Sequence, residues 1–155
     1  IFSKQKYISY LKMLRNLITK PLISTAELGE LIKNRPRNLT IVNANFGYEY
    51  DTHSIKPHDQ WDQIYRNERI PGARHLNLGV IGNQTEKLPN MLPHIENYFQ
   101  YMRDMDIGLN DYVVCYGDEN IVGPCRAWWM FTVFGFPYVS VLDGTFKKWK
   151  QEGLQ

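Results

Sequence analysis

The segment from Asp111 to Gly135 constrains the fold most, because an apolar run passes through a short polar loop into a long apolar stretch. The run DYVVCY is rich in β-branched and aromatic residues, which is typical of a buried strand. The stretch PCRAWWMFTVFG predicts a buried helix that begins at Pro124 and ends at Gly135. A strand, a loop and a helix in succession form the repeating unit of parallel α/β sheets.

Further strands and helices alternate on both sides of this segment. Strands are predicted at LTIVNA (39–44), at about 75–78 and at YVSVL (138–142). Helices are predicted from Ser24, where Glu27 completes a capping box, and at 57–68, 93–105 and 143–153, the last with Phe146 and Trp149 facing inward. The alternation predicts an α/β fold in which helices cover a parallel sheet on both faces.

Length and composition limit the class of protein. The chain has 155 residues, of which 43% are hydrophobic and 22% charged, so one globular domain with an ordinary core is expected. No apolar stretch approaches the roughly 20 residues that a membrane-spanning helix needs, and no such helix is predicted. The two cysteines, Cys115 and Cys125, cannot build a disulfide scaffold, and free thiols are expected.

The N-terminal segment carries the basic character of the chain. Basic residues precede the first acid, Glu27, and alternate with apolar ones: Lys4, Lys6, Ile8, Leu11, Lys12, Leu14, Arg15, Ile18 and Lys20. This pattern indicates a mitochondrial presequence or its remnant, or else an amphipathic helix docked on the domain or on a neighbour. We expect a basic extension over residues 1–20 and a domain over 21–155, located in mitochondria or, alternatively, in the cytoplasm. The basic residues do not continue into an aromatic-interleaved patch, so nucleic-acid binding is not expected.

The loop from Gly117 to Gly123 follows the predicted strand DYVVCY. Ligands of parallel α/β sheets bind beyond the carboxyl ends of strands, and the amides of such a loop can hold an anion. A thiolate there would have a lowered pKa, but neither cysteine lies in the loop. Cys115 lies in the strand, where cysteines usually serve as small hydrophobic residues, and Cys125 is a weak candidate nucleophile in the first turn of the helix.

Other features of the sequence argue against a charged ligand or a metal. Asp118 and Glu119 would repel an anion and raise the pKa of a nearby thiol. The loop GDENIVG lacks the lysine and the Ser or Thr of a P-loop, and Trp128 and Trp129 are expected in the core. The histidines have no ligand-like spacing, so neither a metal nor a cofactor is predicted: His53, His58, His75 and His94.

Several motifs together resemble the rhodanese-like family. RIPGARHLN, RAWWMFTVFG, the following strand, DG and F..W...G occur in its order and spacing. The resemblance covers residues 22–154 and is closest to the N-terminal half of two-domain thiosulfate and 3-mercaptopyruvate sulfurtransferases. It implies a five-stranded parallel sheet with helices on both faces. It also implies sulfur transfer through a persulfide on a cysteine that heads the loop after the central strand.

This chain departs from the family pattern at that loop. Gly117 stands in the position of the cysteine, and the N-terminal halves of two-domain members similarly lack it. The resemblance therefore implies a vestigial anion loop formed by Gly117, Asp118, Glu119, Asn120, Ile121, Val122 and Gly123. Three further departures are Arg69 for the histidine of HIPGA, Asn43 for an aspartate, and Gly144-Thr145 for paired glycines.

These observations leave three hypotheses on function. The first is a non-catalytic accessory or structural subunit that binds protein partners in a larger mitochondrial assembly. The second is the N-terminal half of a sulfurtransferase, with a second rhodanese domain that carries the catalytic cysteine. The third is a single-domain sulfurtransferase that uses Cys125. Aromatic residues of the long loop offer an interface, or pack on their own domain: Phe46, Tyr48 and Tyr50.

Overall fold

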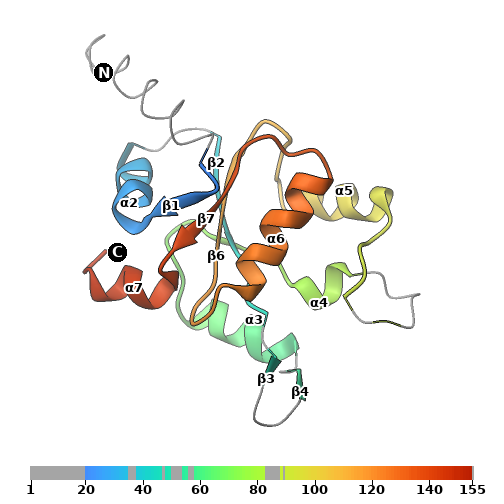
Figure 1. Cartoon of the computed structure of the whole chain (residues 1–155), viewed down its shortest axis with the longest axis horizontal. Coiled ribbons are helices and arrows are strands. Elements are labelled where there is room, and N and C mark those ends of the chain that lie inside the picture. Colours follow the sequence, from blue (N-terminus) through green and yellow to red (C-terminus); the bar gives the residue numbers. More distant parts are fainter. Residues whose placement is uncertain are drawn as a thin grey trace.

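A central parallel sheet lies between two layers of helices (Figure 1). The computed structural model describes residues 20–34, 38–46, 48–49, 54–55, 58–82, 88 and 90–154. The strands lie in the order β1 (Leu22–Ser24), β7 (Val139–Asp143), β6 (Tyr112–Tyr116), β2 (Leu39–Asn43) and β5 (Arg74–His75). Every neighbouring pair is parallel, so the carboxyl ends of all five strands meet at one edge. A separate antiparallel pair joins β3 (Tyr48–Glu49) to β4 (Ser54–Ile55).

The helices cover both faces of the sheet, as the alternating pattern predicts. They are α2 (Thr25–Asn34), α3 (His58–Asn67), α4 (Leu78–Ile81), α5 (Ile95–Asp104), α6 (Val122–Val133) and α7 (Thr145–Gln151). Successive residues of a strand point to opposite faces. Val113 and Cys115 of β6 therefore join a core with α4, α5 and α6. Tyr112, Val114 and Tyr116 join a second core with α2 and α7.

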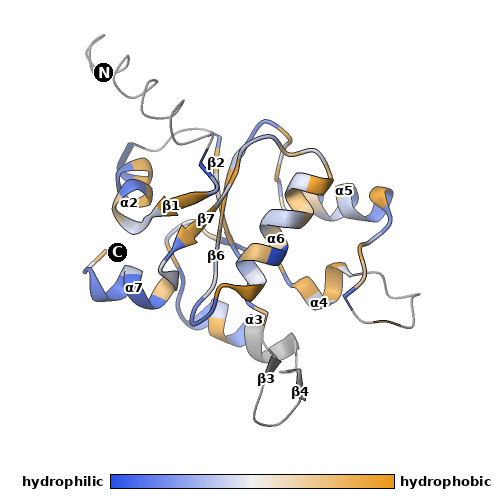
Figure 2. Ribbon diagram, viewed as in Figure 1, coloured by the Kyte–Doolittle hydropathy of each residue, from blue (hydrophilic) through white to orange (hydrophobic). Residues whose placement is uncertain are grey.

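The burial of β6 on both faces explains its composition. All five of its residues are buried, and such a strand has no polar face to leave in water. Figure 2 shows apolar residues along the strands and polar ones mainly on the outer surfaces of α2 and α7. The apolar run in DYVVCY is thus the signature of the central strand.

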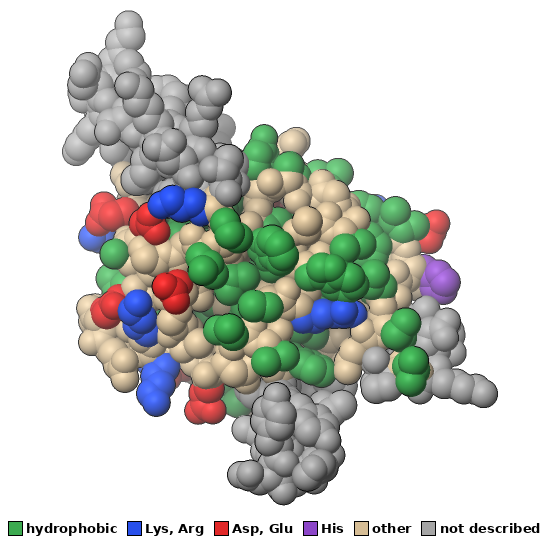
Figure 3. Space-filling model, in the orientation of Figure 1, with side chains coloured by type: hydrophobic (Ala, Val, Ile, Leu, Met, Phe, Trp, Pro, Cys, Tyr) green, Lys and Arg blue, Asp and Glu red, His purple; other side chains and the backbone are tan. Residues whose placement is uncertain are grey.

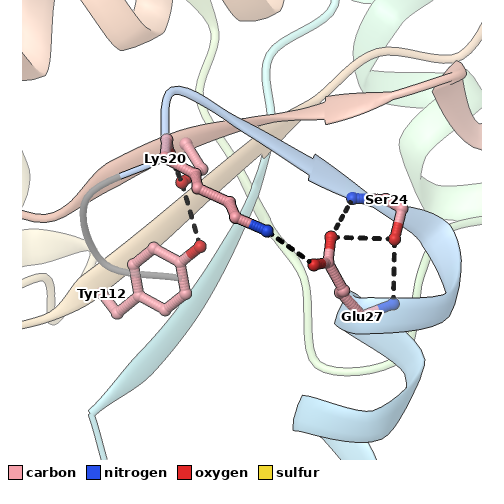
Figure 4. Close-up of polar contacts among 5 residues, drawn as sticks. Lys20, Ser24, Glu27 and Tyr112 are labelled. Atoms are coloured by element: carbon pink, nitrogen blue, oxygen red, sulfur yellow. Dashed lines mark hydrogen bonds and ion pairs between the residues drawn. The ribbon is translucent and has the colours of Figure 1, made fainter. Parts of the chain in front are cut away.

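The predicted capping box at the start of α2 is confirmed. The Glu27 carboxylate accepts hydrogen bonds from the backbone N–H and the hydroxyl of Ser24, both at 2.9 Å, and Glu27 N donates to Ser24 Oγ at 3.2 Å (Figure 4). Lys20 Nζ lies 3.1 Å from the same carboxylate. The Ser24 backbone bond is the main cause of the lowered pKa of Glu27. These contacts fix the turn from β1 into α2.

Three elements differ from the prediction. Strand β1 is not predicted, because three residues carry too little pattern, and its pairing with β7 is a long-range contact. The strand expected at 75–78 ends at His75, and the Asn77 side chain instead caps α4. Helix α6 begins at Val122 rather than Pro124. A proline is tolerated anywhere in a first turn, so its position does not mark the first residue.

The predicted N-terminal extension, residues 1–20, lies outside the described residues apart from Lys20. The side chains of Tyr48 and Tyr50 and of His53 and His58 lie outside them too. Phe46 is described, and it packs partly buried against the core beneath α6. Within the described ranges, no helix has the length and apolarity to cross a membrane.

Candidate functional site

The loop that follows β6 is fastened to its neighbours by backbone hydrogen bonds. Gly117 O accepts from Phe146 N at 2.8 Å, and Asp118 O accepts from Lys147 N at 3.3 Å. Both donors belong to the first turn of α7. The loop therefore lies at the carboxyl end of the central strand, where the fold class places ligands, but α7 holds it in one conformation.

The Asp118 side chain is bound by two asparagines at the end of β2. Asn43 Nδ2 donates to Asp118 Oδ1 at 3.4 Å, and Asn45 Nδ2 donates to Asp118 Oδ2. The Asp118 backbone N–H in turn donates to Asn45 Oδ1 at 2.8 Å. Burial raises the pKa of Asp118, while the asparagine hydrogen bonds act in the opposite direction. The side-chain amides of Asn43 and Asn45, which lie beside the loop, therefore already donate to a carboxylate of the protein itself.

Gly117 lies in a space that admits no side chain. A Cβ atom at this position would lie 2.5 Å from the backbone oxygen of Asn120 and 3.1 Å from Pro124 Cγ. The first of these is far inside van der Waals contact and involves backbone, which cannot rotate away. The loop is closed over the position that the resemblance assigns to the catalytic cysteine.

The loop is also shorter than predicted, because Val122 and Gly123 belong to α6. The Val122 amide donates to Asn120 Oδ1 at 3.1 Å, so this helix-terminal donor already has a partner. A Cβ at Gly123 would overlap Ala44 O, so α6 begins directly against the end of β2. Two of the backbone N–H groups expected to bind an anion over residues 117–123, those of Asp118 and Val122, therefore already donate to groups of the protein itself.

The two cysteines lie in contrasting environments. Cys115 is fully buried in β6, and burial raises the pKa of its thiol far above the ordinary value. It is therefore an un-ionised core residue. Cys125 is exposed in the first turns of α6, and its backbone N–H donates to Ile121 O. Its role as a nucleophile stays a prediction.

A hollow of about 410 Å³ opens beside the loop, between α3 and α7. Its lining mixes both charges: Ile64, Glu68, Asp118, Glu119, Phe146, Lys147 and Lys150. Lys150 Nζ pairs with Glu68 at 2.6 Å and also lies over the Phe146 ring. Because three carboxylates accompany the two lysines, the hollow does not offer the positive field that would attract a dianion such as thiosulfate.

The other departures have structural roles. Arg69, in place of the family histidine, is exposed and donates to the carbonyls of Tyr65 and Arg66 at the end of α3. Thr145, in place of a glycine, has a φ of 62°. This left-handed conformation is unfavourable for a β-branched residue, whereas glycine adopts it freely.

The described histidines do not form a metal site. His75 Nδ1 lies 3.1 Å from Asp62 Oδ1, and the ring stacks on Tyr65 with 4.9 Å between centroids. Burial lowers the pKa of His75, so the ring is neutral near pH 7. His94 is exposed and precedes α5. Among the described residues no three His, Cys, Asp or Glu side chains are grouped to hold a metal.

Sequence reasoning missed two residues of this region, Asn45 and Arg126. Asn45 follows β2 by two positions, and polar residues at that edge of a parallel sheet are a usable signal. Arg126 follows Cys125 inside an apolar stretch, and its charge alone marked it as unusual. Trp129, expected in the core, is 40% exposed, whereas Trp128 donates its indole N–H to Val139 O and is partly buried.

The all-parallel sheet and the loop after its central strand define an α/β protein with a rhodanese-type site frame. A model of the rhodanese-like domain matches residues 24–152. The chain is 30% identical over 146 residues to thiosulfate sulfurtransferase of Cricetulus griseus, covering 91% of this chain and 46% of that protein. The chain belongs to the rhodanese-like family.

Solved structures agree with this assignment. The crystal structure of SseA, a 3-mercaptopyruvate sulfotransferase from Escherichia coli, matches with a TM-score of 0.77 and 27% identity, over 88% of this chain and 49% of that one. The sulfur transferase subunit of yeast mitochondrial complex I shares the fold, with a TM-score of 0.68 and 24% identity over 85% and 41%. The chain thus spans about half the length, or less, of the relatives that it matches.

Proposed function

We propose that this chain is a rhodanese-like module that forms no persulfide and serves as an accessory subunit of a larger protein assembly. The observation that carries the proposal is Gly117: the resemblance places it at the catalytic cysteine, and a Cβ there would lie 2.5 Å from Asn120 O. The Asp118 carboxylate, bound by Asn43 and Asn45, adds an internal anion at the same place. A side chain able to carry a persulfide would therefore lack room, and the Asp118 carboxylate would repel an anionic sulfur donor.

A sulfur-transfer assay tests the absence of catalysis. The purified chain is incubated with thiosulfate and cyanide, which an active enzyme converts to sulfite and thiocyanate, and then with 3-mercaptopyruvate and cyanide. We expect no thiocyanate above the buffer rate, while Escherichia coli 3-mercaptopyruvate sulfurtransferase in parallel gives turnover. Mass spectrometry should find no added sulfur on Cys125. Turnover that disappears in Cys125→Ser would instead establish a single-domain enzyme.

The proposal extends to mitochondria as the location of the accessory role, and two observations support it. One is the basic, apolar-interleaved pattern of residues 1–20 in the sequence. The other is the fold shared with the sulfur transferase subunit of yeast mitochondrial complex I. Native electrophoresis of fractionated cells tests both: we expect the chain in the mitochondrial fraction at the size of a large complex. A chain found only as a free monomer in the cytosol would contradict the proposal.

A second function is favoured by the length of the relatives. Because the chain covers 33% of Escherichia coli 3-mercaptopyruvate sulfurtransferase and 46% of the Cricetulus griseus enzyme, a catalytic partner domain is the alternative. The full-length transcript distinguishes the two functions. A downstream domain in the same reading frame, with a cysteine heading the loop after its central strand, would make this chain the non-catalytic half of a sulfurtransferase.

A further inference from the structure

Helix α6 is apolar on its outer face as well as its inner one. The inner face is buried, as expected, and includes Ala127, Met130 and Phe131. The outer face keeps Val122 54%, Trp129 40% and Val133 49% exposed. Spacings of seven and four residues place these three side chains on one side of the helix. A helix with apolar side chains on both faces is normally covered on both sides, and the described part of this domain covers only one.

Hydrophobic side chains gather on the surface over α6 in the space-filling view (Figure 3). Beside them lies a hollow of about 190 Å³ whose lining includes Phe46, Leu78, Met91, Val122, Arg126 and Met130. Met91 is itself 43% exposed at the rim. From Val122 to Val133 the helix rises about 16 Å, at 1.5 Å per residue, so the apolar strip is much longer than the hollow. A small molecule seated in the hollow would leave most of the strip uncovered.

Arg126 gives this apolar surface one fixed positive charge. Its Nη2 donates to the backbone oxygen of Asn90 at 2.5 Å, and its guanidinium lies 4.6 Å from the centre of the Trp129 ring. Across the described part of the chain, no carboxylate forms an ion pair with it. A guanidinium has five N–H donors, so the described residues leave most of its hydrogen-bonding capacity without an anionic partner.

We propose that this surface, the α6 face formed by Met91, Val122, Arg126, Trp129 and Val133, docks a partner protein whose apolar surface presents one carboxylate. The Asp or Glu side chain enters the hollow and forms a bidentate pair with Arg126, while apolar side chains cover the strip along α6. Burial of a half-buried guanidinium requires such an anion, and Trp and Arg are the residues that most often dominate binding energy. The inference rests on the proposed role as a subunit of an assembly, and it names the face that enters it.

The first step of the test compares four tagged forms of the chain produced in its own organism. These are the unaltered chain, Arg126→Glu, Trp129→Gln and Arg103→Glu, the last an exposed cation on α5 that receives the same charge reversal. All must melt within about 2 °C of the unaltered chain. A candidate partner is a protein that the unaltered chain and Arg103→Glu retain and the two α6-face variants lose.

The second step measures affinity with the purified candidate partner. We expect Arg126→Glu and Trp129→Gln to weaken binding at least about tenfold, which is typical of residues central to an interface. We expect reversal of one acidic residue of the partner to arginine to restore binding to Arg126→Glu and not to the unaltered chain. Unchanged affinity in Arg126→Glu, or no rescuing acid in the partner, would overturn the proposal.

Two other occupants have outcomes of their own. Concentration-dependent dimers of the purified chain that Trp129→Gln abolishes would assign the face to a second copy and overturn the proposal. So would tight binding of a free carboxylate such as 3-methylbutanoate, with 3-methylbutanamide as the uncharged control. Assembly that persists in both α6-face variants would reject this face yet leave the accessory role intact, whereas thiocyanate release would reject the proposed function itself.

Discussion

The loop after β6 and the outer face of α6 adjoin each other, yet they differ in how many of their polar and apolar groups have partners within the described residues. In the loop, Asp118 is bound by two asparagines and the position of Gly117 is closed by Asn120. On the outer face of α6, Trp129 is partly exposed and Arg126 bonds only a backbone oxygen among the described groups. Within the described residues, the chain thus closes the loop position that the resemblance assigns to the catalytic cysteine and leaves part of the adjacent α6 surface exposed.

The largest expected effect comes from Gly117→Cys, which introduces a thiol at the loop position that has no space for a side chain. We expect the free energy of unfolding to fall by about 2–3 kcal/mol, because the new Cβ must displace the Asn120 backbone. We also expect no sulfur transfer. Urea unfolding and the thiocyanate assay measure the two outcomes.

The matched control for that variant is Gly108→Ala. A Cβ at Gly108 would meet nothing closer than Asp111 Oδ1 at 3.8 Å, so the free energy of unfolding should change by less than about 1 kcal/mol. A stable and active Gly117→Cys protein would show that the loop can open, and the contrast with the α6 face would fail.

The next effect is that of Asp118→Asn. The variant replaces one carboxylate oxygen by an NH₂ group, which donates, so the side chain can no longer accept from both Asn43 and Asn45. We expect the free energy of unfolding to fall by about 1 kcal/mol at pH 7. Burial raises the pKa of Asp118 in the folded protein, so the folded state binds the proton more tightly than the unfolded one. Its contribution is therefore greatest below the ordinary aspartate pKa and falls as the pH rises through the folded pKa.

The pH dependence gives that prediction its test. Urea unfolding at a series of pH values from 3 upward should show the advantage of the unaltered chain over Asp118→Asn shrinking as the pH rises. Asp104→Asn, at an exposed position of α5, is the matched control for replacing one carboxylate by an amide. An advantage that instead grows with pH would mean that the asparagine hydrogen bonds outweigh burial at Asp118.

A gain of stability is expected from Thr145→Gly. Thr145 has a φ of 62°, and its neighbour Phe146 donates to Gly117 O, so the strained residue helps to hold the loop closed. Glycine relieves the strain, and we expect the free energy of unfolding to rise by about 1 kcal/mol. Thr132→Gly, inside α6, should lower it by about the same amount. If both variants changed the free energy of unfolding by the same amount and in the same direction, the backbone of Thr145 would not be strained.

The smallest effect is predicted for the open face. Val133→Thr replaces a half-exposed side chain by one of similar shape, and we expect the free energy of unfolding to change by less than about 0.5 kcal/mol. Phe131→Ala, two residues earlier on the buried face, should cost about 3 kcal/mol or more. A large loss in Val133→Thr would show that this face is already covered within the chain.

Much of the fold is legible in the sequence because its signals are local. The β-branched run of β6 and the capping box at Ser24 and Glu27 depend on residues within a few positions of one another. The same holds for the inward Phe146 and Trp149 of α7, both buried as expected. Strand β1 escapes such reasoning, because its three residues become a strand only by pairing with β7 across the chain.

The sequence alone determined the α/β class, the buried central strand and the glycine at the head of its loop, since these follow from residue type and short-range periodicity. Only the tertiary structure decided that Asn45 and Asp118, 73 positions apart, meet and that the space at Gly117 is closed. It also decided which side of α6 stays open. An apolar helix has the same pattern whether its own domain or a partner covers it, so exposure is a property of the packed chain.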